Sequence, residues 1–444
     1  MSKNTVRRNL TRRNFLKIAG STLITAAGAR LLPRYLGKNV IQPSGIEVAS
    51  AQSIPPDLYL AGTDGWIHLP SLPAIPPFHP DELAPAPFNT YMFGFRNVTG
   101  MTETQKLNQK NKAQHQNPLF WTQQDVPFRV QLTNLGLALR PDLTDAHTLH
   151  FHGLRNAIPF FDGEPMGSVS VPIGRDFTYV YNVHEPGTYM YHCHVEDVEH
   201  VQMGMTGLVF VRPAQDGNTA LYPSGKYAYN CGDGSTGFDR EFAMFLSEIW
   251  SEAHWADSHI QLPEWTDYKP DFYLLNGRTY PDTIESNSPD AIDPATPSYD
   301  ANGDLKITPG LERLQYQPYS SLVTCNEGEQ VLLRFANLGF MRQTMTLTGI
   351  KMRIVGKDAT LQRGRDGTDF SYSTNSITMG AGESHDAIFT APAYVGPDPY
   401  DTYLLYNRNY SRINKLDGSG YGGQMTEVRV YPTGSLPVQT LPNS

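Results

Sequence analysis

His147-Thr148-Leu149-His150-Phe151-His152-Gly153 is one of two histidine-rich stretches in this chain of 444 residues. The other is Tyr191-His192-Cys193-His194, which is followed by His200 and Met205. Aromatic residues stand among the histidines, and Gly153 closes the first stretch, as is typical of short β-strands that end in a turn. The two stretches therefore predict a β-protein with metal ligands on neighbouring strands.

The alternation of side chains along a strand sorts these ligands into two sets. Successive side chains point to opposite faces, so His150 and His152 share one face and His147 points to the other. The same rule separates Cys193 from the two histidines beside it. We expect one set with His147 and Cys193, and a second set on the opposite side. The second set, called the histidine face below, consists of His150, His152, His192 and His194.

The set with Cys193 gains further ligands from the residues that follow it. His200 adds a second imidazole, and Met205 adds a thioether, with the nearby Met203 as the alternative axial ligand. Two imidazoles, a thiolate and a weak axial sulfur are the ligands of a blue-copper electron-transfer site. We call His147, Cys193, His200 and Met205 the cysteine site. Its mixed ligands suit both Cu(I) and Cu(II).

The histidine face predicts a different kind of metal site. Imidazole ligands alone favour Cu(II) or Zn, and they bind oxygen species where a coordination position stays open. Cys193 is joined through the backbone to His192 and His194. An electron taken at the thiolate would therefore have a short through-bond path to a metal on the histidine face.

Several motifs resemble the multicopper oxidase family over nearly all of the chain after residue 52. Asp162-Gly163-Glu164-Pro165 and 187–192 resemble its first domain, whereas His-x-x-His-x-His-Gly and His-Cys-His resemble its copper-rich last domain. The resemblance implies two cupredoxin-like Greek-key β-sandwich domains. It also implies that the cysteine site binds type 1 copper with Met205 as axial ligand, because the spacing His200-x-x-x-Gly204-Met205 matches the family. On the histidine face, the resemblance implies that His150 is a type 2 copper ligand. It also implies that the other three histidines are type 3 copper ligands, namely His152, His192 and His194.

The sequence departs from the family in two places. Val195–Glu199 is longer than the family's spacer before the second type 1 histidine, and its acidic residues predict either a docking loop for a cationic partner or a solvated turn. In the second half, 343–349 and 407–409 lack histidine where the family's ligands would stand. That half resembles the copper-free middle domain of three-domain oxidases, so one chain supplies only half of a trinuclear cluster. Two chains that meet through their first domains would complete it, which makes a homo-oligomer one expectation.

The composition supports an all-β protein of more than one domain. The chain has 38 Gly and 34 Pro, which favour short strands joined by turns. We predict a copper-binding domain over 52–213, a linker over 214–240 and a second domain without copper ligands over 241–444. Similar strand ends, Leu132-Thr133-Asn134 and Phe335-Ala336-Asn337, suggest an internal duplication. The net charge of -9 argues against nucleic acid as a partner.

The predicted strands are bounded by turn residues in both halves. In the first half they are Thr90 to Arg96, Val126 to Leu132, His147 to His152, Phe177 to Val183, Gly187 to His192 and Gly204 to Pro213, after a Pro-rich segment that reaches Pro87. In the second half they are Phe242 to Glu248, Asp271 to Leu275, Gln330 to Ala336, Met345 to Val355, Asn375 to Met379, Asp386 to Thr390, Thr402 to Tyr406 and Thr426 to Val430.

The N-terminus predicts export. Arg12-Arg13 with Phe15-Leu16-Lys17 and a weakly apolar run resembles a twin-arginine signal over 1–51. Ala49-Ser50-Ala51 is the expected cleavage site, and Ala27-Gly28-Ala29 is the weaker alternative. The expected location is the periplasm, the cell surface or the medium. In such a compartment Cys231 and Cys325 form either a disulfide or two separate thiols.

Histidines outside the two stretches carry weaker signals. The spacing of His254 and His259 matches no metal site, and His184 and His385 are expected to serve local hydrogen bonding. The sequence as a whole favours a copper oxidoreductase that takes electrons from a small molecule, a metal ion or a redox protein and passes them to oxygen or to a second copper site. The alternatives are a mononuclear blue-copper electron carrier and a copper-binding surface protein without oxidase activity.

Overall fold

A computed structural model describes residues 55–444, apart from residues 73, 156, 289–292, 296, 298 and 415–419. Contacts divide the chain into Met1–Ile54 and Pro55–Ser444. The signal predicted over 1–51 lies outside the described residues. Within the described ranges, no helix is both long enough and apolar enough to cross a membrane.

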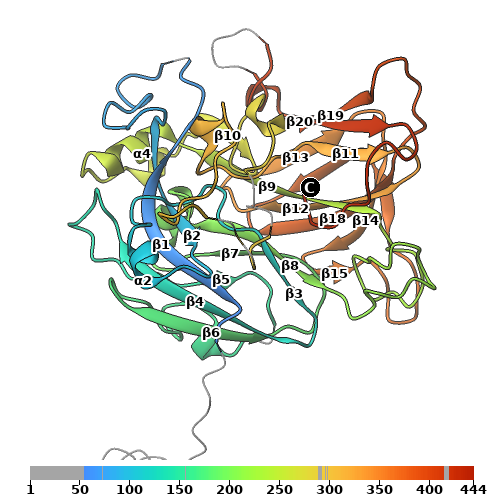
Figure 1. Ribbon diagram of the computed structural model, residues 1–444, viewed down its shortest axis with the longest axis horizontal. Coiled ribbons are helices and arrows are strands. Elements are labelled where there is room, and N and C mark those ends of the chain that lie inside the picture. Colours follow the sequence, from blue (N-terminus) through green and yellow to red (C-terminus); the bar gives the residue numbers. More distant parts are fainter. Residues whose placement is uncertain are drawn as a thin grey trace, which may run out of the picture. The chain divides into compact units, whose positions relative to one another are not determined.

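The first half of the described chain forms a pair of four-stranded sheets (Figure 1). One sheet has the order β2-β1-β4-β6, with β1 at Leu58–Ile67, β2 at Thr90–Asn97, β4 at Pro127–Gly136 and β6 at Asp176–Asn182. The other has the order β3-β8-β7-β5, with β3 at Phe120–Gln123, β5 at His150–Phe151, β7 at Gly187–His192 and β8 at Thr206–Arg212. The ligand-bearing strands β5 and β7 are therefore direct neighbours.

Alternating burial shows why these strands pack as they do. On β4, Val130 and Leu132 are buried, whereas Arg129 and Gln131, which alternate with them along the strand, are partly exposed. A strand with one apolar face buries that face against the facing sheet. Val130 and Leu132 join Tyr179 and Tyr191 in the core of this half, and Cys193 belongs to the same cluster.

The second half forms two larger sheets. The seven-stranded sheet has the order β10-β9-β12-β18-β14-β15, with β16 beside β14. Its strands are β9 at Arg240–Ile249, β10 at Phe272–Leu275, β12 at Gln330–Asn337, β14 at Met352–Lys357, β15 at Thr360–Leu361, β16 at Tyr372–Thr374 and β18 at Glu383–Thr390. The five-stranded sheet has the order β11-β20-β19-β13-β17, with β11 at Val323–Asn326, β13 at Gln343–Leu347, β17 at Ser376–Met379, β19 at Asp401–Asn407 and β20 at Met425–Tyr431. The predicted all-β class is confirmed.

The two halves repeat one topology, which supports the suggested duplication. β4 lies between a parallel β1 and an antiparallel β6, and β12 lies in the same way between β9 and β18. The order β3-β8-β7-β5 likewise recurs as β11-β20-β19-β13. In this repeat, β13 and β19 occupy the positions of the ligand strands β5 and β7.

The helices are short and lie in connections between strands. They are α2 at Glu103–Leu107, α3 at Asp197–Gln202 and α4 at Ser251–Ser258, with 3-10 turns at Pro159–Phe161, Trp265–Asp267, Asp282–Ile284, Glu312–Leu314 and Tyr410–Arg412. Thr102 and Gln105 form a capping box that begins α2. Helix α4 packs beside β2.

Several predicted strand boundaries were wrong. β1 runs through the segment assigned to a Pro-rich approach, and β3 and β11 were missed. The single strand predicted from Met345 to Val355 is two strands, because Gly349 adopts a φ of 76° and turns the chain between β13 and β14. The strand predicted from His147 to His152 is limited to β5, and His147 forms an isolated bridge with Val171.

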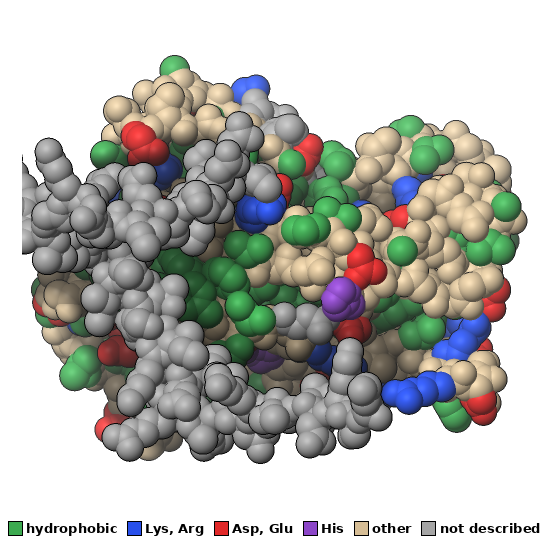
Figure 2. Space-filling model, turned by 90° about the horizontal axis from the view of Figure 1, so that it is seen from below, with side chains coloured by type: hydrophobic (Ala, Val, Ile, Leu, Met, Phe, Trp, Pro, Cys, Tyr) green, Lys and Arg blue, Asp and Glu red, His purple; other side chains and the backbone are tan. Residues whose placement is uncertain are grey.

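The segment 214–240 packs against the second half. Tyr229 and Phe238 are buried with Leu332 and Ile388. Contacts keep Pro55–Ser444 as one unit, so the predicted boundaries at 213 and 241 stay a prediction. On the described part of the face in Figure 2, acidic and basic side chains are interspersed with apolar ones.

Candidate metal centre

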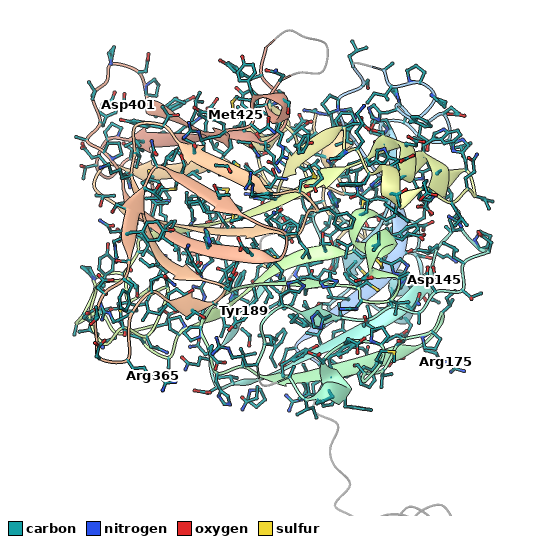
Figure 3. The ribbon with its side chains drawn as sticks, turned by 180° about the vertical axis from the view of Figure 1, so that it is seen from behind. Asp145, Arg175, Tyr189, Arg365, Asp401 and Met425 are labelled. Carbon is teal, nitrogen blue, oxygen red and sulfur yellow. The ribbon has the colours of Figure 1, made fainter. Side chains whose placement is uncertain are left out.

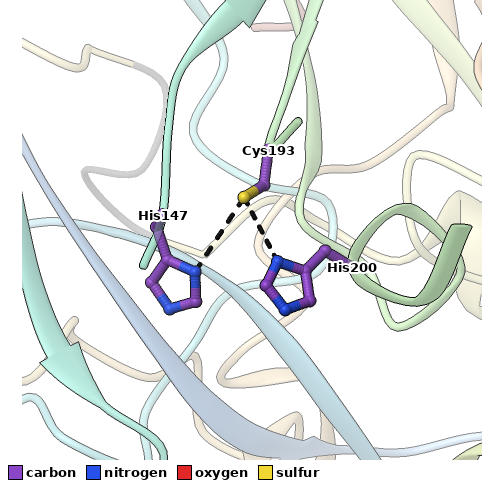
Figure 4. Close-up of side chains that lie close together, drawn as sticks. All are labelled: His147, Cys193 and His200. Atoms are coloured by element: carbon purple, nitrogen blue, oxygen red, sulfur yellow. Dashed lines mark hydrogen bonds between the residues drawn. The ribbon is translucent and has the colours of Figure 1, made fainter. Parts of the chain in front are cut away.

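Three different segments bring the principal ligands of the cysteine site together. His147 precedes β5, Cys193 follows β7 directly, and His200 lies on α3. The Cys193 Sγ atom lies 3.2 Å from Nδ1 of His200 and 3.9 Å from Nδ1 of His147 (Figure 4). All three side chains are fully buried. Their potential ligand atoms lie within 4.8 Å of one another, which is a suitable spread for binding one ion.

Met205 completes this group from the segment after α3. Its backbone N–H donates to the His200 carbonyl, and its carbonyl accepts the Cys193 N–H, at 2.8 and 3.1 Å. A Cβ built on Gly62 would lie 2.6 Å from Cδ2 of His147 and 3.4 Å from the Met205 methyl, so the thioether lies near the His147 ring. Met203 is equally buried. Met205 remains the predicted axial ligand.

The electrostatics of the cysteine site favour a thiolate. Burial opposes ionisation of Cys193, but the neighbouring His200 and His147 outweigh it and hold the pKa of the thiol well below its usual value. Burial likewise opposes protonation of His200, yet Cys193 and Asp145 raise its pKa to about 10. Without metal, both shifts favour a thiolate paired with an imidazolium. A metal cation would replace the proton of His200.

Asp145 and Thr148 support these ligands, and the sequence interpretation missed both. Asp145 Oδ2 lies 3.5 Å from Nε2 of His200, on the side of the ring away from Cys193. Figure 3 shows Asp145 near one edge of the fold. The Thr148 N–H points to the Cys193 sulfur at 3.5 Å, and its hydroxyl accepts the His194 N–H at 2.9 Å. Such outer contacts orient ligands and tune a bound metal.

The histidine face lies on the opposite side of the same strands. His150 and His192 are directly paired across β5 and β7. The Nε2 atoms of His152 and His192 are 2.9 Å apart, and His150, His192 and His194 hold potential ligand atoms within 4.8 Å. The structure thus gathers the histidines of this face in the arrangement that strand alternation requires.

Backbone carbonyls fix the orientation of two of these rings. Nδ1 of His150 lies 2.7 Å from the Asp162 carbonyl, and Nδ1 of His192 lies 2.6 Å from the Cys193 carbonyl. Since a carbonyl only accepts, each Nδ1 carries the hydrogen and each Nε2 keeps its lone pair for a metal. Burial, with His152 nearby, lowers the pKa of His192 to about 3. This ring is neutral and able to bind metal at neutral pH.

A cavity of about 370 Å³ opens beside His150 and His152. The first half lines it with Tyr189 of β7, labelled in Figure 3, and with Thr188 and Met190. The second half contributes Asp358, Gly382 and Ser384. Among the residues lining this cavity, the second half supplies no histidine.

The second half carries amides where the repeat places the ligand strands. Asn407 at the end of β19 donates hydrogen bonds to Gln343 at 2.8 Å and to Gln424 at 2.6 Å. All three side chains are fully buried. A buried amide network satisfies its own polar atoms and leaves no strong metal donor. The absence of copper ligands from the second half stays a prediction.

The remaining cysteines and histidines have other surroundings. All three cysteines are free, so the disulfide considered for Cys231 and Cys325 is absent. Burial raises the pKa of Cys325 to about 12. His254 contacts two backbone carbonyls and His184 contacts Asp125, whereas Nδ1 of buried His385 has no hydrogen-bond partner among the described residues, contrary to expectation.

The acidic insertion forms the start of α3. Glu196 adopts a left-handed conformation with φ of 45° and precedes the helix. Glu196 and Asp197 are exposed, whereas Glu199 is half-buried. The longer spacer is thus a helical turn that carries His200 back to Cys193.

The donor set of the cysteine site fits copper. It joins two imidazole nitrogens to a thiolate in a buried pocket with a thioether nearby, and thiolate with imidazole selects copper among the metals of electron transfer. The Nδ1 atoms of His147 and His200 face the Cys193 sulfur, so these nitrogens are the ligating candidates (Figure 4).

Comparisons with known proteins agree with this reading. A family model described as multicopper oxidase matches residues 129–216. The fold is similar to the blue copper oxidase from Nitrosomonas europaea, with 18% identity and a TM-score of 0.54 over 84% of this chain and 85% of that chain. It is also similar to the multicopper oxidase mgLAC, with 18% identity and a TM-score of 0.56 over 86% and 87%. No curated protein gives a significant match. The chain is therefore a multicopper-oxidase-like protein with cupredoxin-like sheets and a type 1 copper-like site.

Proposed function

We propose that this protein is an exported copper oxidoreductase whose cysteine site takes electrons one at a time from a reductant. The observation that carries the proposal is the convergence of His147, Cys193 and His200 in a fully buried pocket, with ligand atoms within 4.8 Å of one another. Copper bound there would supply reversible one-electron redox chemistry.

The protein residues hold and isolate this site. Cys193, His147 and His200 would be the strong ligands of a bound copper ion, and Met205 would add a weak thioether ligand. Asp145 orients the His200 ring, and the Thr148 N–H stabilises negative charge on the sulfur. The backbone between Cys193 and its neighbours His192 and His194 gives electrons a covalent route to the histidine face.

The proposed reductant is a small molecule, a metal ion or a redox protein, and oxygen is the proposed final acceptor. Oxygen reduction would need more histidines than one chain gathers, since Asp358, Gly382 and Ser384 line the second half's side of the cavity. We therefore propose that two chains meet through their histidine faces. A monomer that keeps full oxidase activity with copper only at the cysteine site would contradict this arrangement.

The lining of this cavity by Asp358, Gly382 and Ser384 also favours a second candidate. This candidate is a mononuclear electron carrier whose histidine face holds one ion or none. A carrier would bind about one copper per chain and would consume no oxygen. A copper-binding surface protein, the third candidate, would bind copper tightly without a reversible colour change.

One set of measurements separates these candidates. Metal content per chain, visible absorption and paramagnetic resonance would be measured on the same sample, together with oxygen uptake in the presence of a phenol or ferrous iron. Oxidase function predicts blue colour, copper on the histidine face and oxygen uptake. Blue colour without oxygen uptake would support the carrier and contradict the oxidase.

Export is proposed from the N-terminal motif alone. Changing Arg12 and Arg13 together to Lys should leave the full-length precursor inside the cell, because the twin-arginine receptor reads the arginine pair. A matched change of Arg7 and Arg8 to Lys keeps the same charge outside the motif. Equal export of both variants would contradict the twin-arginine route.

A further inference from the structure

Asp81, Glu82 and His259 form a cluster outside both copper-ligand sets. Asp81 and Glu82 lie in the segment before β2, and His259 directly follows α4. One carboxylate oxygen from each acid and one ring nitrogen lie within 4.8 Å of one another. The sequence did not indicate that these side chains lie close together, because about 180 residues separate the two segments.

The hydrogen bonds of His259 fix which ring nitrogen carries the hydrogen. Nδ1 lies 2.9 Å from the Trp255 carbonyl, which only accepts. The Ser258 hydroxyl, also 2.9 Å from Nδ1, donates to Asp81. Nδ1 must therefore be the donor, and in the neutral ring Nε2 presents its lone pair.

That lone pair faces a carboxylate. Nε2 of His259 lies 3.2 Å from Oε1 of Glu82. Two acceptors at this distance repel each other unless a cation, either a proton or a metal ion, lies between them. The Trp255 ring stacks on the His259 ring at 4.1 Å and holds it in this orientation.

Asp81 gives the cluster a fixed, buried oxygen ligand. The residue is 5% exposed, and its carboxylate accepts hydrogen bonds from the Leu83 N–H and the Ser258 hydroxyl. Glu82 is exposed and free to adjust, with a side-chain exposure of 62%. A rigid acid, an oriented imidazole and an adjustable acid together make a ligand set open to solvent.

We propose that Asp81, Glu82 and His259 bind a divalent metal ion of the manganese, ferrous or zinc class, at a site separate from the copper ligands. Carboxylate oxygens with one imidazole suit these ions and lack the thiolate that favours copper(I). The ion would join the segment before β2 to α4. His254 on α4 contacts the carbonyls of Tyr91 and Gln202, so the ion would also secure the packing of α4 beside α3.

The test uses the full chain with its copper sites loaded and Mn²⁺ as the probe. Calorimetric titration and the loss of the free Mn²⁺ paramagnetic signal would count the ions bound. We expect one Mn²⁺ per chain, with affinity weakened at least about tenfold by Glu82→Gln and by His259→Gln. Glu252→Gln is the matched control, because it removes the same charge from an exposed position on α4.

Two outcomes would overturn the proposal. One is no Mn²⁺ binding by the copper-loaded protein, which would mean that a proton bridges His259 and Glu82. The other is equal affinity in the wild type, Glu82→Gln and Glu252→Gln, which would place the ion elsewhere. Because Glu82 is exposed, Glu82→Gln should keep the blue absorption and the fold, so lost binding in this variant supports the site rather than reporting unfolding.

Discussion

Nδ1 of His200 lies 3.2 Å from the Cys193 sulfur, and Asp145 stands 3.5 Å from the other nitrogen of the same ring. The imidazole is thus held between a thiolate and a carboxylate. Both negative groups raise its pKa, and the ring in turn lowers the pKa of Cys193. The buried pocket therefore maintains a charged ligand pair that is ready to exchange a proton for a metal ion.

Changing Cys193 to Ser should abolish the blue absorption while metal remains on the histidine face. The hydroxyl is a poor ligand for copper(I) and cannot give the thiolate charge-transfer band, whereas His150, His192 and His194 lie on the opposite side of the strands. Visible absorption and metal analysis would check this result. Cys325→Ser, which alters a buried free thiol elsewhere, should keep the colour. Loss of all metal from Cys193→Ser would contradict the separation into two sites.

The affinity of the cysteine site for copper should fall as the pH is lowered. With a pKa of about 10, His200 is protonated throughout the neutral range, so copper must displace one proton. The neighbouring histidines hold the pKa of Cys193 well below its usual value, which reduces the contribution of the thiol to this dependence. The expected slope is about tenfold in affinity per pH unit, flattening near pH 10. Competition with a chromophoric copper(I) chelator between neutral and alkaline pH would measure it.

Asp145→Asn tests the cause of this dependence. Removing the carboxylate lowers the pKa of His200, so the affinity should level off at a lower pH than in the wild type. Asp142→Asn changes a nearby acid that pairs with Arg140 and should leave the profile unchanged. Identical profiles for the wild type and Asp145→Asn would show that Asp145 does not act on the ring.

The sequence predicted the ligand grouping because strand alternation is a local rule. The strand from Gly187 to His192 has the predicted bounds, and its alternation decides the face of Cys193. The grouping also holds at His147, although the observed strand begins only at His150, because the extended chain keeps the same alternation through the bridge to Val171.

The supporting contacts escaped prediction because they depend on tertiary structure. Asp145 stands two residues before His147 and resembles any turn residue, yet it meets a ring carried by α3. Gly382 lies beside His152 only because the two halves pack together. Likewise, nothing near Asp81 or His259 in the sequence shows that α4 brings them together. The periodicity of side chains along a strand or helix carries no information about such tertiary contacts.

Arg334→Met should destabilise the contact between the two halves. The fully buried guanidinium donates to Glu241 at 3.0 Å and to Asp386 at 3.3 Å, and Asp386 also accepts the Thr188 hydroxyl from β7. Removing the cation leaves the buried Asp386 carboxylate to the hydroxyls of Thr188 and Tyr229, whereas Glu241 keeps its ion pair with Arg212. Loss of one partner from a buried ion pair costs up to about 3 to 5 kcal/mol. Thermal unfolding followed by circular dichroism would detect the loss. Arg365→Met, at an exposed loop position labelled in Figure 3, should change stability little, and equal effects of both variants would contradict the assignment.

Gly62→Ala should disturb the cysteine site without removing a ligand. The added Cβ would lie 2.6 Å from Cδ2 of His147 and 3.4 Å from the Met205 methyl, so the imidazole or β1 must shift. Overpacking of this kind costs about 1 to 3 kcal/mol. We expect a changed blue absorption band and a changed reduction potential, because both depend on the positions of the imidazole and the axial sulfur.

Gly167→Ala is the control for that substitution. Its Cβ would meet no atom closer than 3.7 Å, and its backbone needs no left-handed conformation. Absorption spectra and redox titrations of the two copper-loaded variants would be compared with the wild type. If Gly62→Ala kept the wild-type spectrum and potential, His147 and Met205 would not both be ligands in the positions described. In those positions, the added methyl group would clash with the His147 ring.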